Sequence, residues 1–189
     1  MDNPNFLKLA TAYGLRAYVT AKVAQEGKSQ QKERVTVLLR YLLKDGGLGV
    51  DNEPPTPRIE MMSRLLDLGA DANGSDGSLT AWENLLGFPA SPIVGALTFV
   101  KSDYNARFLV LRYLQIMEML SRSGADLQAF IFGYEFVSRM TAVDIVEKIS
   151  IPEYPLQVAS LMEVLQETMN RVKIDGNRKH PETRLRKPG

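Results

Sequence analysis

The chain has 189 residues, of which 44% are hydrophobic and 24% charged, a composition typical of one soluble globular domain. Its 23 basic and 22 acidic residues leave a net charge of +1, which excludes a globally basic nucleic-acid-binding protein. It has no Cys, and its only His is His180, close to the end of the chain. Disulfides, cysteine metal sites and a histidine general base in the folded body are therefore excluded.

The chain also lacks the sequence features of export and of membrane insertion. The first residues show no basic region followed by an apolar stretch, as a secretory signal would. The longest apolar run, Ile93 to Val100, is less than half of what a membrane-spanning helix needs. We therefore expect a cytoplasmic protein with no membrane span.

In chain order, three segments with helical periodicity align with one another without gaps. They read MMSRLLDLGADA from Met61, IMEMLSRSGADL from Ile116 and LMEVLQETMN from Leu161. Each carries one apolar stripe with a period of 3.6 residues. The first two end in Gly-Ala-Asp, where Gly69 and Gly124 predict left-handed caps and the following Asp predicts a side-chain bond to the turn backbone.

Shorter helical segments precede these three. LKLATAYG starts at Leu7, LRAYVTAKV at Leu15, and further apolar runs start at Thr36, Thr80 and Thr141. A Thr in front of an apolar run is a helix N-cap signal. The order is therefore a Thr-capped short helix, a loop, a longer helix and a Gly-Ala-Asp turn.

These residues resemble the ankyrin repeat family. The segment DGSLTAWE from Asp76 resembles the start of a repeat, and the GADAN ending at Asn73 resembles a second helix with its exit turn. The order also resembles the C-terminal ankyrin-like region of large fungal proteins that carry an upstream NACHT-type P-loop NTPase, over about Phe6 to Val172. The resemblance implies an all-α, ankyrin-like helical repeat solenoid that binds proteins.

The repeats are degenerate, because their spacing exceeds the 33 residues of an ankyrin unit. Thr36 and Thr80 are 44 positions apart, and Thr80 and Thr141 are 61 apart. Two insertions explain the excess: residues 44–57, whose Gly and Pro content predicts a loop, and residues 87–103, with a possible short helix from Pro92. We expect a repeat domain of about four helix pairs over residues 1–172.

Residues 173–189 form a separate basic segment. From Arg171 onward seven basic residues face two acidic ones, a net charge of +5. The last fourteen residues contain one aliphatic side chain, Leu185, which predicts a disordered tail. An alternative function is therefore electrostatic binding of nucleic acid or an anionic membrane through this tail.

The sequence contains no complete motif for a phosphate-binding loop or a calcium loop. The Gly-rich run from Asp45 lacks the Gly-Lys-Ser/Thr of a phosphate-binding loop. A calcium loop that started at Asp71 would need Gly at its sixth position and Glu at its twelfth, where Asp76 and Trp82 stand. We interpret residues 71–77 as an exit hairpin in which Asn-Gly and Asp-Gly supply positive φ. Trp82 and the Met residues of the longer helices are interpreted as core. We predict no cofactor, no metal and no catalytic activity.

An aromatic segment follows the second Gly-Ala-Asp turn. Phe130, Phe132, Tyr134 and Phe136 alternate strictly, which places them on one face of an extended segment. Packing on the insertion around Phe88 and Phe99 is one interpretation. The other is a projecting face that anchors a protein partner, because large exposed apolar patches are uncommon unless used. The sequence thus predicts a non-catalytic protein-interaction module with these four residues as its partner-binding site. The partner is another protein or, alternatively, other domains of a parent chain such as the NTPase that the resemblance implies.

Replacing Phe132 and Tyr134 by Ser distinguishes the two interpretations. Aromatic anchors of an interface contribute about 2 kcal/mol or more to binding, so the change should weaken partner binding and barely alter the melting temperature. Core positions should instead each cost about 3 kcal/mol of folding free energy. That corresponds to a melting point lowered by about 6–12 °C, a loss that would contradict the partner-binding interpretation.

Overall fold

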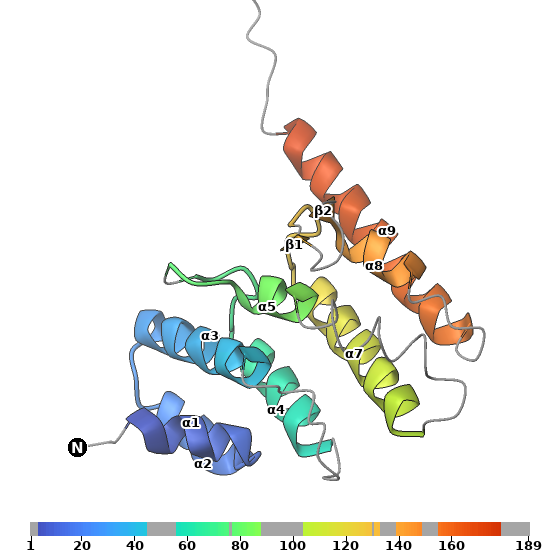
Figure 1. The fold of residues 1–189 in the computed structure, drawn as a ribbon. Coiled ribbons are helices and arrows are strands. Elements are labelled where there is room, and N and C mark those ends of the chain that lie inside the picture. The colour runs from blue at the N-terminus through green and yellow to red at the C-terminus, as the bar shows by residue number, and fades with distance from the viewer. Residues whose placement is uncertain are drawn as a thin grey trace, which may run out of the picture.

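The computed structural model describes residues 4–44, 56–75, 77–87, 104–129, 131–132, 139–148 and 155–178. Over these residues the chain forms eight helices and one antiparallel pair of two-residue strands (Figure 1). The elements are α1 Pro4–Ala12, α2 Arg16–Val23, α3 Lys28–Lys44, α4 Thr56–Asp67, α5 Ala81–Gly87, α7 Tyr104–Arg122, β1 Ile131–Phe132, β2 Arg139–Met140, α8 Ala142–Lys148 and α9 Pro155–Arg178.

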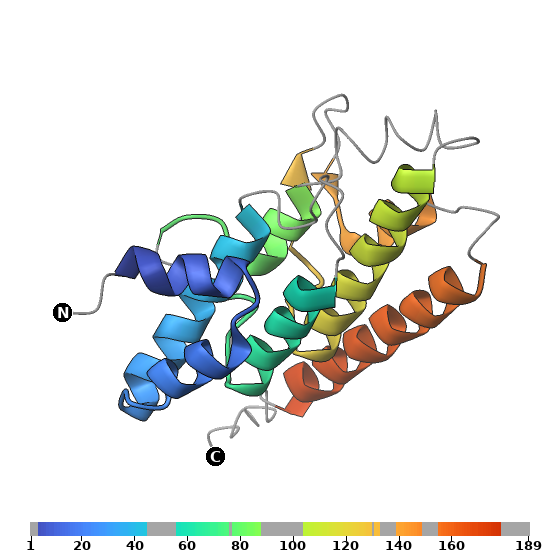
Figure 2. The same cartoon turned by 90° about the horizontal axis from the view of Figure 1, so that it is seen from below.

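The described part of the chain is all-α, as predicted, apart from the short strand pair. Three pairs of helices that follow one another in the chain pack together: α1 with α2, α3 with α4, and α8 with α9. Further contacts are made by α1 with α3, α3 with α5, and α7 with α9. As a result α1 and α2 lie at one end of the molecule and α9 at the other (Figures 1 and 2). None of the helices described is both long and apolar enough to cross a membrane.

Three helices end at a glycine with positive φ, which confirms the predicted caps at Gly69 (φ 93°) and Gly124 (φ 87°) and adds Gly14 (φ 71°). Each cap has the same pair of hydrogen bonds. At Gly69 the glycine N–H donates to the carbonyl of Leu66 (2.9 Å), and the next N–H, that of Ala70, donates to the carbonyl of Leu65 (3.0 Å). This Schellman arrangement satisfies carbonyls that the helix end leaves open, and it turns the chain sharply out of the helix.

Two of the predicted threonine caps are confirmed. Thr80 Oγ1 accepts from the N–H of Glu83 (3.0 Å), and the Glu83 carboxylate accepts from the N–H of Thr80 (2.8 Å). Thr141 and Asp144 form the same reciprocal box, with distances of 3.4 and 2.7 Å. Each box satisfies two backbone donors at a helix start, which fixes where α5 and α8 begin.

The predicted cap at Thr36 is wrong. Helix α3 begins at Lys28, so Thr36 lies in its middle, and its hydroxyl donates to the carbonyl of Lys32 (2.8 Å). The physical reason is that the polar residues before Thr36 form the solvent-exposed first turns of the same helix, and the apolar run that follows forms its buried part.

The buried apolar side chains form one cluster, with members in each of the eight described helices. Trp82 is fully buried in α5, which confirms that it packs in the core. Met61, Met62 and Met117 are also fully buried, in α4 and α7, as predicted for the longer helices. Tyr113 lies among them, and burial raises the pKa of its hydroxyl well above the usual value. Residues from all eight described helices therefore share one core.

The boundaries of the insertions and of the tail differ in part from the expectation. Helix α4 begins at Thr56, so Pro57 lies in a helical first turn, where proline loses no hydrogen bond. Residues 45–55 and 88–103, including the expected helix at Pro92, lie outside the described residues. Helix α9 continues through 173–178, the first part of the segment expected to be a tail, and 179–189 lie outside the described residues.

Candidate functional site

The turn that leaves α4 is tied to α3 through Thr36. The backbone N–H of Asp71 donates to Thr36 Oγ1 (2.9 Å), and the carboxylate of Asp71 pairs with Lys32 Nζ (3.3 Å). The hydroxyl of Thr36 accepts this bond while it donates to its own helix, so both of its functions are used. This bond sets the position of the first Gly-Ala-Asp turn on α3.

The same turn is tied to the next Gly-Ala-Asp turn through the side-chain amide of Asn73. Asn73 Nδ2 donates to the carbonyl of Gly124 (2.8 Å), and Asn73 Oδ1 accepts from the N–H of Asp126 (2.7 Å). One side chain therefore bridges the exits of α4 and α7. We call Thr36, Asp71, Asn73, Gly124 and Asp126 the turn row.

Both aspartates of the turn row bond the turn that they open, as predicted. Asp71 Oδ1 accepts from the N–H of Asn73 (2.9 Å), and Asp126 Oδ1 accepts from the N–H of Gln128 (3.0 Å). Such an aspartate turn mimics a backbone turn. The two exits therefore share one local conformation as well as the bridge between them.

Gly74 corrects the predicted role of the Asn-Gly pair. Positive φ is found at Gly77 (φ 95°) but not at Gly74. A Cβ atom at Gly74 would instead lie 2.5 Å from Thr36 Cγ2, closer than real Cβ contacts allow. Glycine is needed at position 74 because the turn approaches α3 so closely.

Residues 71–75 and 77–80 lead from this turn into α5, and the N–H of Trp82 donates to the carbonyl of Ala72 (3.1 Å), so the two ends of this hairpin lie together. Ser78 Oγ accepts from Arg40 Nη1 (3.1 Å), and Asn84 Nδ2 donates to the carbonyls of Leu79 (3.2 Å) and Thr80 (2.9 Å). The Leu79 side chain stays 55% exposed. It lines an open cavity of about 770 Å³ together with Ser75, Gly77, Ser78, Thr80, Glu83 and Asn84. The hairpin is thus held in place while it presents an apolar side chain and several hydroxyl and amide groups.

The predicted aromatic site lies only partly within the described residues. Phe130, Tyr134 and Phe136 fall outside them. Phe132 lies in β1, which pairs antiparallel with β2 so that Phe132 is opposite Arg139 and Ile131 is opposite Met140. The backbone at Phe132 is therefore extended, and β1 packs against α5. The role of the four aromatic residues as partner anchors stays a prediction.

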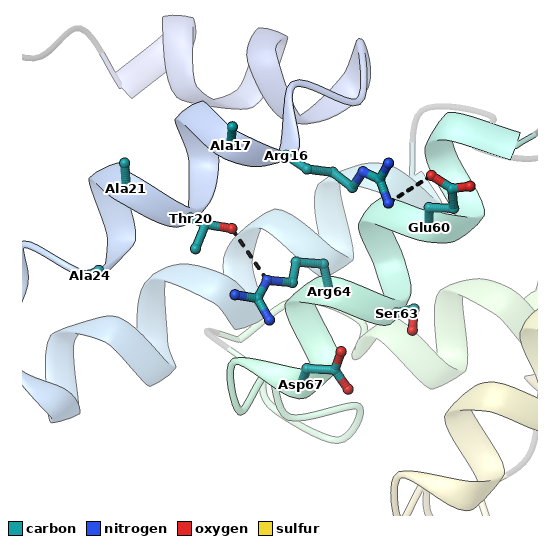
Figure 3. A pocket seen from close by; sticks show the side chains of 9 residues that line it. All are labelled: Arg16, Ala17, Thr20, Ala21, Ala24, Glu60, Ser63, Arg64 and Asp67. Carbon is teal, nitrogen blue, oxygen red and sulfur yellow. Dashed lines mark hydrogen bonds and ion pairs between the residues drawn. The ribbon is translucent and has the colours of Figure 1, made fainter.

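A second cavity of about 660 Å³ lies between α2 and α4 (Figure 3). Its charged groups bond across it: Arg16 Nη1 lies 2.8 Å from Glu60 Oε2, and Arg64 Nε donates to Thr20 Oγ1 at 3.3 Å. Both members of the ion pair are about half exposed, so the pair contributes little to stability. These contacts join the first two helix pairs, and the guanidinium groups are already engaged within the chain.

Two residues that hold the turn row and the hairpin after it, Asn73 and Arg40, were not identified from the sequence. Asn73 follows the first Gly-Ala-Asp in the sequence, a position that predicts a turn but not the bond from its side chain to the second Gly-Ala-Asp turn. Arg40 is buried to 7% exposure inside an apolar helix face. Arg40 stands alone in an apolar run of the sequence. This pattern indicates a buried arginine that is hydrogen-bonded within the protein, because a charged group is rarely buried without a partner.

No family model, no curated protein and no solved structure matches this chain. The resemblance to ankyrin repeats and to the region beside NACHT-type domains stays a prediction.

The close approach at Gly74 gives a prediction about stability. Gly74→Ala should destabilise the fold by about 1–3 kcal/mol, because the new methyl group meets Thr36 Cγ2. Thr36→Ser removes Cγ2 and keeps the hydroxyl for Asp71, so the double variant should regain at least about 0.5 kcal/mol of that loss. Chemical unfolding of the four proteins measures the coupling. Strict additivity of the two changes would contradict this contact.

Proposed function

We propose that this chain is a non-catalytic protein–protein interaction module, built as an ankyrin-like stack of helix pairs. Its partner would lie along the edge formed by the turn row and by the hairpins that follow it. The observation that carries the proposal is the bridge from Asn73 to Gly124 and Asp126. It sets two equivalent turns side by side, as a repeating protein needs in order to present one continuous binding surface.

The two hairpins that leave these turns support the proposal. The hairpin at 71–80 carries Leu79, an exposed leucine held on a bonded backbone. The segment after Asp126 leads into the paired strands β1 and β2, and β1 packs against α5. An ordered backbone lowers the entropy cost of binding, and apolar side chains on it supply binding energy. We propose that Leu79 and the aromatic face that includes Phe132 contact the same partner.

The chemistry of the edge favours binding over catalysis. Its polar side chains are used to hold backbone: Thr36 and Asn73 bind turn amides, and Asn84 binds two carbonyls. The chain has no Cys, and its one His lies far along the sequence in the basic segment. Hydroxyl and amide groups with no activating base suit hydrogen bonding to a partner better than nucleophilic attack.

A photo-crosslinking amino acid at position 79 tests the proposal. With benzoylphenylalanine in place of Leu79, cells that express the chain should yield a defined crosslinked protein. The matched control is the same replacement at Leu156 in α9, which is 79% exposed and is not part of the turn row. The protein captured should then bind the purified chain directly, and Leu79→Ser should weaken that binding about tenfold or more, as loss of an interface anchor does. Leu156→Ser should leave the binding unchanged.

Two outcomes would contradict the proposal. Crosslinks that are the same from positions 79 and 156 would show that the turn edge has no special role. Binding that depends steeply on salt and vanishes when residues 179–189 are deleted would favour the electrostatic alternative. The melting temperature of Leu79→Ser serves as the folding control, because an exposed surface change alters stability by less than about 0.5 kcal/mol.

A further inference from the structure

Asn73 is the only asparagine of the sequence that precedes a glycine. Asparagine is chemically labile, and a following glycine has no Cβ to hinder attack by its backbone nitrogen on the asparagine side chain. In that reaction a bond forms from the Gly74 nitrogen to Asn73 Cγ, and the bond from Cγ to Nδ2 breaks. The side-chain nitrogen leaves as ammonia with the proton of the Gly74 amide. Water then opens the resulting imide at either carbonyl, which gives aspartate or isoaspartate.

In the folded chain both reacting groups are engaged elsewhere. The N–H of Gly74 donates to the carbonyl of Asp71 (3.1 Å). The amide of Asn73 is held on the other turn by the carbonyl of Gly124 (2.8 Å) and the N–H of Asp126 (2.7 Å). The attack requires all of these bonds to open, because the side chain must swing back onto its own backbone. The bridge therefore opposes the reaction, although Asn73 is exposed to water.

The product of the reaction is unable to make the same bridge. Deamidation replaces the amino group that donates to the Gly124 carbonyl by a carboxylate oxygen, which only accepts. A further negative charge would also stand beside the carboxylates of Asp71 and Asp126. Isoaspartate would in addition place an extra methylene group in the main chain, where the turn lies close to Thr36. The two turns would therefore not rejoin in the same way.

We propose that Asn73 is a site of spontaneous deamidation, that its bridge to the second Gly-Ala-Asp turn suppresses the reaction in the folded chain, and that the product keeps the two turns apart. Separation of the turns would then leave a permanent chemical mark at this residue. The inference does not rest on the proposed function, because the reaction needs only water and the chain itself.

Comparison of the native chain with the chain unfolded in urea tests the suppression. Both samples are incubated at mildly alkaline pH, digested with pepsin in acid, where the imide forms slowly, and analysed by chromatography and mass spectrometry for aspartate and isoaspartate. Deamidation at Asn73 should be at least about tenfold slower in the native chain. Asn84, which precedes Leu85, should convert far more slowly than Asn73 in urea and serves as the internal control. Equal rates at Asn73 in both samples, or no deamidation there in urea, would overturn the proposal.

Two variants of Asp126 separate the bridge from the rest of the fold. Asp126→Pro removes the carboxylate and the N–H that bonds Asn73, whereas Asp126→Ala removes only the carboxylate. Under native conditions, deamidation at Asn73 should be at least about tenfold faster in the proline variant than in the alanine variant. Asp71→Ala, which releases the backbone N–H of Asn73, serves if Asp126→Pro does not fold, and it should also exceed the alanine variant. Equal rates would show that the bridge does not protect the amide.

Asn73→Asp tests the consequence of the reaction, because it gives the aspartate product as a uniform sample. It should lower the midpoint of urea unfolding at neutral pH, since the carboxylate has no hydrogen to donate to the Gly124 carbonyl. The matched control, Asn170→Asp, makes the same change at an exposed position of α9 and should leave the midpoint unchanged. A midpoint for Asn73→Asp equal to that of the wild type would contradict the claim that the product keeps the turns apart.

Discussion

The contact on which the arrangement of the turn row depends is the one that Asn73 makes with the neighbouring turn. Its amide group donates to the carbonyl of Gly124 and accepts from the N–H of Asp126. An amide has one donor and one acceptor side, so this pairing fixes both the spacing and the direction of the two turns. Because Thr36 also bonds Asp71, the exit of α4 is tied to α3 on one side and to the exit of α7 on the other.

Local signals at the helix ends make this arrangement possible. Glycine caps stop α4 and α7 at equivalent positions, and reciprocal Thr boxes start α5 and α8 after the hairpins. The chain therefore leaves α4 and α7 and enters α5 and α8 at defined residues. The two ends of the molecule differ in their exposed side chains: beyond its first turn α9 exposes mainly polar residues, whereas α1 and the turn after it expose Phe6, Leu9 and Tyr13.

Sequence reasoning succeeded where a feature depends on neighbours in the chain. The caps at Gly69, Gly124, Thr80 and Thr141, the aspartate turns and the buried Trp82 follow from local patterns. It failed at Thr36 and Gly74, which are 38 positions apart and contact each other in the fold. A Thr before an apolar run starts a helix at Thr80, but the same pattern lies in the middle of a helix at Thr36. The exposure of Leu79 and the bridge from Asn73 also depend on contacts between distant residues, which one sequence does not display.

Native-state hydrogen exchange of the Asp126 amide tests the central claim most directly, because this N–H donates to Asn73 and to no helix carbonyl. The account predicts that it is protected in the wild type and that Asn73→Ala speeds its exchange at least about tenfold. The amide of Gln128, which donates to Asp126 of the same turn, should keep its exchange rate in that variant. An Asp126 amide that exchanges at the unprotected rate in the wild type, or equally fast in both proteins, would contradict the bridge between the two turns.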